Sequence, residues 1–210
     1  MLHLIPKHHC PEWLANSHLL TWKIHAMDAL EALHSRSSVP RLSEPLPSPQ
    51  MLENIYKAAF RAADHAVLRP WRFLLIKGDS RIRLGDLFVD AGLANDASLG
   101  SNAQEKLRRK PMRAPLIVVC ISNYKPHPKV PQIEQDLSAA AATQNMLLAA
   151  FAQGVGAMWR TGSLAYNSVV KHGLGLSADE KIIGFLYIGT IEGGTKQLCE
   201  PDVQAHFQEW

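Results

Sequence analysis

The spacing of hydrophobic residues along the chain predicts several amphipathic helices. Apolar positions recur every three or four residues in these segments, which is the period of an α-helix. In residues 50–63, for example, Leu52, Ile55, Ala59 and Ala62 form one stripe. The predicted helices cover residues 27–35, 50–63, 80–95, 132–154 and a short stretch near 166–172.

Shorter apolar runs between the helices predict strands. Residues 71–78, 114–122 and 181–190 are rich in aliphatic and aromatic side chains, as strands are. Residues 155–164 fit either a strand or a loop. Helices and strands alternate without regular strand–helix–strand units, and this favours an α+β fold in which a small central sheet is flanked by helices.

The segments between these elements contain few hydrophobic residues. Residues 39–49 contain four prolines and are predicted to be a connector, which ends where Ser48 caps a helix that has Pro49 at its first position. Residues 96–104 are small and polar and are predicted to be loose. Residues 105–113 carry five cations and one anion. They fit a solvated helix face or a docking surface for a phosphorylated cosubstrate.

The segment 132–154 has an unusual composition. From Leu137 to Ala152 it is small or apolar almost all the way round, which predicts a helix buried on every side. Its surroundings are either the core of the protein or a second subunit. Because so apolar a helix is unusual in a lone small domain, the sequence favours a homodimer.

The composition excludes several classes of protein. The chain has 210 residues, of which 47% are hydrophobic and 20% charged, as is usual for a globular domain. A net charge of +3 does not indicate a nucleic-acid-binding protein. No apolar run reaches the roughly 18 residues of a membrane helix. One domain is predicted over residues 27–210, with residues 1–26 as an N-terminal extension outside the fold that does not resemble a signal peptide.

The cysteines and histidines give little indication of chemistry. The three cysteines are widely spaced and form no disulfide framework or metal motif, and this predicts a cytoplasmic location. Cys120 lies in an apolar run and is predicted to be a thiol of the hydrophobic core. Five histidines fall in residues 1–26, but their spacing matches no known ligand pattern, so no metal site is predicted. Motifs for phosphate-binding loops, zinc hydrolases and nucleophilic serines are also absent, and no catalytic side chain is assigned.

Three groups of residues that bind anions well remain, each at the end of a predicted element. They are Arg36, Ser37 and Ser38; Arg61 and His65; and Trp159, Arg160 and Thr161. Arginine and hydroxyl groups suit a phosphate, and the indole of a tryptophan suits a flat ring. The alternative is that these are unrelated helix caps and surface residues.

Several segments together resemble a known family. In order and spacing, "MDALEALHSRSSVPRL", "AAFRAADHAVLRPWRFLLIKG", "MRAPLIVVCIS", "KVPQIEQDLSAAAATQNMLLAAFAQGVGAMWRTG" and "IIGFLYIGT" are similar to the small FMN-dependent nitroreductases, especially the short bacterial NAD(P)H nitroreductases. The resemblance runs from about Met27 to about Thr190. It implies an α+β fold and an interlocked homodimer with FMN at the subunit interface.

The resemblance also implies roles for the three groups. Arg36, Ser37 and Ser38 would hold the FMN phosphate and ribityl chain, while Arg61, His65 and the segment Trp159, Arg160, Thr161 would complete the flavin site. Ala149, Ala150, Phe151, Ala152, Gln153 and Gly154 match a segment associated with the nicotinamide cosubstrate. Three positions depart from the family pattern: Ala63 stands for a proline, Arg69 for a glutamine and Thr161 for a serine.

The implied activity is a two-step transfer of electrons. NADH or NADPH reduces FMN, and the flavin then reduces a nitroaromatic, a quinone or a similar acceptor in a ping-pong cycle. Another flavin reaction on the same fold is an alternative: dehalogenation, enone reduction or flavin fragmentation. A flavin-binding module without turnover is another. No nucleic acid or membrane partner is expected.

Overall fold

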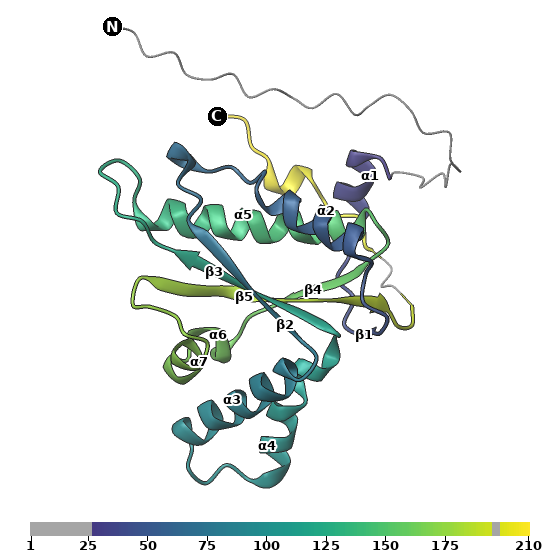
Figure 1. Cartoon of the computed structure of the whole chain (residues 1–210). Coiled ribbons are helices and arrows are strands. Elements are labelled where there is room, and N and C mark those ends of the chain that lie inside the picture. Colours follow the sequence, from purple (N-terminus) through teal and green to yellow (C-terminus); the bar gives the residue numbers. More distant parts are fainter. Residues whose placement is uncertain (1–26, 195–197) are drawn as a thin grey trace, which may run out of the picture.

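The computed structural model describes residues 27–194 and 198–210, and its centre is an antiparallel sheet (Figure 1). Its five strands follow the order β1-β5-β3-β2, with β4 also paired to β5. They are β1 (Leu42–Ser43), β2 (Trp71–Lys77), β3 (Leu116–Asn123), β4 (Gly156–Arg160) and β5 (Glu180–Ile191). The long strand β5 pairs with β1, β3 and β4, so it organises the sheet.

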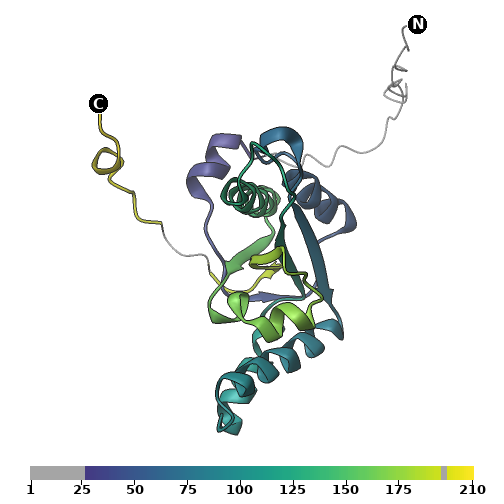
Figure 2. The same ribbon diagram turned by 90° about the vertical axis from the view of Figure 1, so that its left-hand side faces the viewer.

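Helices cover both faces of the sheet, as the two views in Figures 1 and 2 show. One face carries α1 (Ala29–Ser35), α2 (Pro49–Ala59) and α5 (Gln132–Phe151). The opposite side carries α3 (Ser80–Asn95), α4 (Ser101–Arg108), α6 (Ser163–Tyr166) and α7 (Ser168–Gly173). Three short 3₁₀ helices complete the described elements: η1 (His65–Val67), η2 (Lys110–Arg113) and η3 (Gln204–His206). This arrangement confirms the predicted α+β class.

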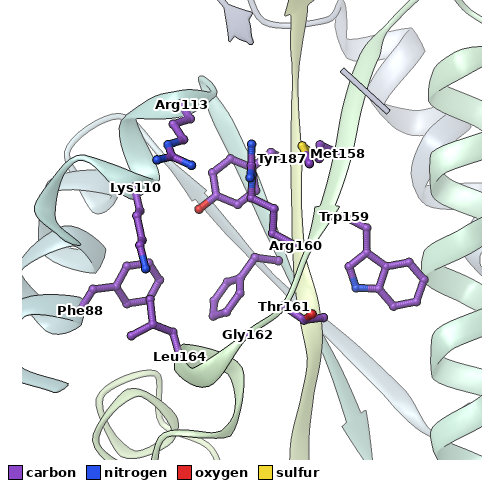
Figure 3. Close-up of a pocket in the computed structure, with 11 residues that line it drawn as sticks. Phe88, Lys110, Arg113, Met158, Trp159, Arg160, Thr161, Gly162, Leu164 and Tyr187 are labelled. Carbon is purple, nitrogen blue, oxygen red and sulfur yellow. The ribbon is translucent and has the colours of Figure 1, made fainter. Parts of the chain in front are cut away.

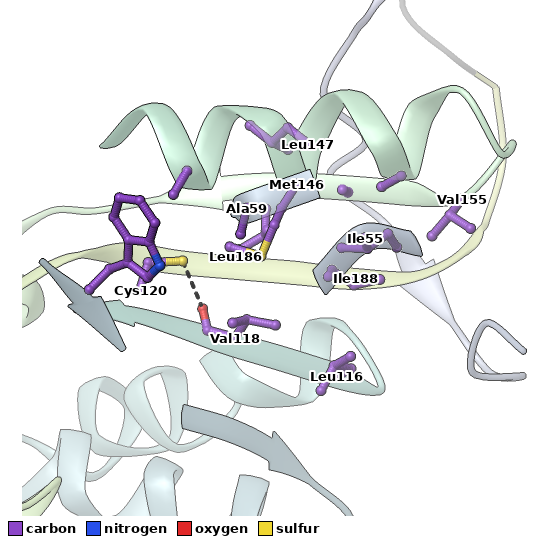
Figure 4. Close-up of a cluster of buried hydrophobic side chains, with 14 of the residues drawn as sticks. Ile55, Ala59, Leu116, Val118, Cys120, Met146, Leu147, Val155, Leu186 and Ile188 are labelled. Carbon is purple, nitrogen blue, oxygen red and sulfur yellow. Dashed lines mark hydrogen bonds between the residues drawn. The ribbon is translucent and has the colours of Figure 1, made fainter. Parts of the chain in front are cut away.

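The alternation of side chains along the strands separates two hydrophobic cores. In β5, Leu186 and Ile188 belong to the core beneath α5, whereas Phe185 and Tyr187 belong to the core beneath α3. Figure 4 shows the first of these cores, where Met146 from α5 packs with Leu186 and Ile188. Each face of the sheet therefore receives every second residue of the same strand.

A bulge interrupts this alternation in β5. Cys120 of β3 pairs with Gly184, but the next residue, Ile121, pairs with Ile182. Ile183 is therefore an extra residue on β5, which is the definition of a β-bulge. The extra residue lets Ile182 and Phe185 belong to the same core although they are three positions apart.

Several predicted elements are confirmed by the structure. Ser48 caps α2, since its hydroxyl accepts a hydrogen bond from the Met51 amide at 3.3 Å, and Pro49 is the first helical residue. The helix α3 has the predicted bounds, 80–95. Residues 155–164, which fitted either a strand or a loop, contain β4.

Other predictions are wrong. Residues 96–104 are not all loose, because α4 begins at Ser101. The predicted helix 50–63 ends at Ala59. The connector 39–49 contains β1, whose two residues pair with Thr190 and Ile191 of β5. A local pattern cannot reveal so short a strand, because a distant partner stabilises it.

The helix α5 is not buried on every side within one chain. Its buried face includes Ala139, Ala142 and Met146, which pack on the sheet. On its other side, Ile133 and Leu137 each expose 61% of their surface. The single chain therefore does not bury this helix on every side, and its burial by a second subunit stays a prediction.

The remaining sequence predictions concern single residues and the chain as a whole. Cys120 is a buried core thiol, as predicted, and burial raises its pKa to about 12. Within the described part of the chain, no helix is both long and apolar enough to span a membrane. The five N-terminal histidines lie outside the described residues.

Candidate functional site

Two of the three predicted anion-binding groups lie side by side. The segment that follows α1 runs along β4, and the Val39 amide donates to the Ala157 carbonyl at 3.1 Å. Arg160 Nη2 donates to the Pro40 carbonyl at 3.5 Å, which ties the same segment to the end of β4. The structure thus places residues 36–38 and 159–161 on neighbouring segments.

The end of α1 presents Arg36 and Ser38 together. The Arg36 amide completes the last turn of the helix by donating to the Ala32 carbonyl, and the chain is extended beyond it. Arg36 Nη1 donates to Ser38 Oγ at 3.4 Å. Ser37 lines a separate small hollow of about 140 Å³ with Leu147 and Phe151. The Arg36 guanidinium and the Ser38 hydroxyl are therefore close together, as an anion site requires.

Arg160 lines the larger hollow shown in Figure 3, which has a volume of about 440 Å³. Cationic side chains from η2 and β4 line part of it, and aromatic rings from α3 and β5 line another part. The lining residues are Phe88, Lys110, Arg113, Met158, Trp159, Arg160, Thr161, Gly162, Leu164, Phe185 and Tyr187. None of the described residues that line this hollow is acidic.

The positive charge in the hollow is not compensated by the described residues. The Nε of Arg160 is buried and has no hydrogen-bond partner there, and the Arg160 guanidinium lies 5.3 Å from the centre of the Tyr187 ring. Burial and then the charge of Arg113 lower the pKa of Arg160, and the same two causes lower the pKa of Lys110. Burial raises the pKa of Tyr187. Such a group of cations favours an anionic ligand.

Trp159 is held in a fixed position beside the bulge. Its Nε1 donates to the Ile183 carbonyl at 3.3 Å. A Cβ on Gly184 would lie only 2.0 Å from that nitrogen, so no residue with a side chain fits there without displacing the indole. The bulge and Gly184 together make room for Trp159.

The third group, Arg61 and His65, lies elsewhere in the single chain. Arg61 lines an apolar groove of about 400 Å³ between α1, α2 and α5. His65 Nδ1 lies 2.6 Å from Glu134 Oε2, and the turn after it contains Ala66, Val67 and Arg69 with positive φ. One chain therefore does not bring Arg61 into the hollow of Arg160.

The predicted nicotinamide segment, residues 149–154, covers the end of α5. Ala150 is fully buried, whereas Ala149 and Ala152 line the apolar groove with Arg61. Phe151 lines the small hollow with Ser37 and Gly154. The side chain of Gln153 accepts a hydrogen bond from Asn54 Nδ2 at 2.8 Å and donates one to the Ala149 carbonyl at 2.8 Å. Gln153 thus fastens α5 to α2, and a role for the segment in binding a nicotinamide stays a prediction.

Lys110, Arg113 and Tyr187 are lining residues that the sequence did not single out. Lys110 and Arg113 belong to the basic run 105–113, so the run itself was the available signal. The pattern could not show which of its cations face a hollow. No group of acidic, histidine or cysteine side chains suited to a metal ion occurs within residues 27–194 and 198–210.

Comparisons with known proteins identify relatives across most of the chain. The model of the nitroreductase family matches residues 33–190. The Escherichia coli K12 protein named "Putative NAD(P)H nitroreductase YdjA" is 42% identical over 164 residues, which cover 78% of this chain and 88% of that protein.

Solved structures share the fold. A nitroreductase-like family protein from Bacillus cereus superposes with a TM-score of 0.77 at 21% identity, covering 91% of this chain and 98% of that one. A nitroreductase with bound FMN from Bacteroides fragilis superposes with a TM-score of 0.62 at 22% identity, covering 86% of this chain and 97% of the other.

Proposed function

The chain belongs to the nitroreductase family, and we propose that it is an FMN-dependent oxidoreductase that uses NADH or NADPH to reduce a nitroaromatic, quinone or similar acceptor. The name of its E. coli relative supports the nicotinamide cosubstrate. The FMN bound in the B. fragilis structure supports the flavin.

One observation carries the assignment of FMN to this chain. Two segments far apart in the sequence, each with an arginine and a hydroxyl group, run side by side, and the Nε of Arg160 lacks a partner among the described residues. A phosphate would supply the missing acceptor and the missing negative charge. The residues present therefore fit the cofactor. Those that would hold it are Arg36, Ser37, Ser38, Trp159, Arg160 and Thr161.

The protein contributes binding and orientation. Bound FMN would carry electrons from the nicotinamide to the acceptor. Arg36 and Arg160 would neutralise the charge of the ligand, and the Ile183 carbonyl fixes the indole of the neighbouring Trp159. Cys120 is not a nucleophile for this reaction, because it is buried and its raised pKa keeps it a thiol.

We also propose that two copies of the chain form a homodimer across the apolar groove. Ala32, Ala58 and Ala149 line that groove, and small residues allow helices to approach closely. Leu33 beside them exposes 56% of its surface. Arg61 and His65 would then reach the flavin from the second copy. Leu33→Asp is expected to give monomers by sedimentation, and an unchanged dimer would contradict the proposed interface.

The scattered cysteines support the cytoplasmic location that the sequence predicts, since Cys120 and Cys199 are both free thiols. The boundary at residue 26 between an extension and a single domain stays a proposal.

An absorption spectrum of the purified protein, followed by anaerobic titration with NADH and NADPH, tests the function. We expect a flavin spectrum that the nicotinamide bleaches and that an added quinone restores. Arg36→Ala should weaken FMN binding by about 1.5–3 kcal/mol, the value of a hydrogen bond to a charged group. Arg41→Ala is the matched control, because Arg41 is a nearby exposed arginine. Protein that stays colourless in excess FMN would contradict the proposal.

A further inference from the structure

The basic run 105–113 is divided by the structure into two parts. Arg108 pairs with Asp86 at 2.9 Å, and Arg109 pairs with Glu105 at 2.6 Å, so acidic neighbours neutralise the first part. Lys110 and Arg113, three residues further on, line the hollow of Arg160 and form no ion pair within the described residues. In a 3₁₀ helix, residues three apart lie on the same side, so η2 directs both cations to one place.

Lys110, Arg113 and Arg160 come from two different parts of the chain and surround the same hollow. Figure 3 shows Lys110 and Arg113 on η2 and Arg160 on β4, with the ring of Tyr187 beside them. Like charges placed together in a half-buried hollow repel one another. Burial first, and then the repulsion from Arg113, lowers the pKa of Lys110 and that of Arg160. A bound dianion would offset this repulsion.

The rest of the hollow is apolar and aromatic. Phe88, Phe185 and Leu164 also line the hollow, and the rings of Phe88 and Phe185 pack edge to face with centres 5.6 Å apart. A volume of about 440 Å³ is within the range of small-molecule sites. The hollow thus offers charge for a phosphate next to a surface for a flat ring.

We propose that Lys110, Arg113 and Arg160 form a binding site for the phosphate or diphosphate group of a ligand that also carries a flat ring. Both FMN and the nicotinamide dinucleotide combine phosphate with a flat ring. The assignment to these two ligands rests on the proposed function. The phosphate contact itself depends only on the three cations. Lys110 and Arg113 would be binding residues additional to those that the family resemblance implies.

Calorimetric titration with inorganic pyrophosphate tests the site without any redox reaction. Lys110→Ala and Arg113→Ala should each weaken pyrophosphate binding by about tenfold or more, because each removes one charged contact. Arg113→Lys should retain part of the affinity, since it keeps the charge but loses the paired donors. Lys106→Ala is the matched control: it removes a charge from the same run, but Lys106 is exposed and does not line the hollow. Circular dichroism checks that each variant is folded.

Two further measurements identify the source of the phosphate. If it belongs to FMN, Lys110→Ala and Arg113→Ala raise the FMN dissociation constant, measured by flavin fluorescence, about tenfold relative to Lys106→Ala. If it belongs to the nicotinamide dinucleotide, FMN binding is unchanged. The KM for NADH or NADPH then rises by a similar factor, at constant kcat.

The result that overturns the inference differs from the one that overturns the proposed function. Wild-type protein that does not bind pyrophosphate, or folded variants that bind it as well as Lys106→Ala does, would refute the phosphate site, whether or not the protein is a flavoprotein. Unchanged FMN affinity together with unchanged KM values would refute the assignment to these two ligands. Wild-type protein without affinity for FMN would instead refute the proposed function.

Discussion

The two faces of the sheet are made from the same strands but differ in what they bury. Beneath α5, Met146 and Leu186 are almost completely buried among other apolar side chains. On the opposite face, Tyr187 lies between an apolar core and a hollow surrounded by three cations. Neighbouring residues of one strand can therefore have opposite roles, because the pleat sends them to different environments.

The largest expected effect contrasts these two faces at adjacent positions. Leu186→Ala removes a fully buried side chain beneath α5 and should lower the free energy of unfolding by about 2–5 kcal/mol. Tyr187→Phe, one residue further on, removes only a hydroxyl next to the hollow and should cost less than about 1 kcal/mol. Urea unfolding of both variants measures the difference. Equal losses would show that the two faces do not differ as described.

A second effect concerns the ion pair between Arg72 of β2 and Glu180 of β5. Arg72 donates two hydrogen bonds to the Glu180 carboxylate, whose side chain is only 6% exposed, and this pairing is the main cause that lowers the pKa of Glu180. Arg72→Ala should cost about 2–3 kcal/mol, less than the loss of a fully buried pair, because Arg72 itself is one-third exposed.

The pH dependence of stability checks the same contact. Because the folded protein lowers the pKa of Glu180, the contribution of this carboxylate is present above its ordinary pKa and is lost as the pH falls through the lowered value. Arg72→Ala should therefore lose less stability in acid than wild type does. Parallel acid profiles for the two proteins would contradict this interpretation.

A smaller effect is expected at the start of α2. Ser48→Ala removes the hydroxyl that accepts from the Met51 amide and should destabilise the protein by about 1 kcal/mol. Thermal unfolding measures the loss. Ser48→Asp, which keeps a capping oxygen, should restore most of it, and a failure to do so would assign the loss to another contact.

The last prediction is that the Cys120 thiol does not react with an alkylating reagent in the folded protein. With a pKa of about 12, on the order of one Cys120 thiol in ten thousand is ionised at pH 8. Iodoacetamide should therefore leave Cys120 unmodified in the folded protein while modifying the exposed Cys199. Peptide mass spectrometry before and after denaturation locates the labels, and rapid labelling of native Cys120 would show that the core beneath α5 opens.

Local signals made part of the fold predictable. The cap at Ser48, the period of residues 80–95 and the apolar run in β3 each act over a few neighbouring residues, and the structure has all three. The strand β1 and the helix α4 could not be read in this way. The first depends on pairing with β5, which is far along the chain, and the second on packing against the preceding helix α3.

The candidate site was predictable in its residue types but not in its arrangement. Arginine and serine at the end of a helix indicate an anion site, yet only the pairing of the Val39 amide with Ala157 shows that residues 36–38 lie next to residues 159–161. Likewise, the charge of the run 105–113 is visible in the sequence. Which cations turn toward Arg160 depends on the 3₁₀ turn and on the acidic partners of Arg108 and Arg109.

The extra residue in β5 limits how this strand can change in length. Removing Ile183 would restore an unbroken ladder with β3 and would leave Ile182 opposite Ile121, on the same face as Phe185, but it would take away the carbonyl that holds the Trp159 indole. The deletion would therefore leave the Glu180 ion pair and the core beneath α3 on their present face, and its effect would fall on the position of Trp159. A functional descendant or redesign of this protein should therefore keep an extra residue between Ile182 and Gly184, even where Ile183 itself is replaced.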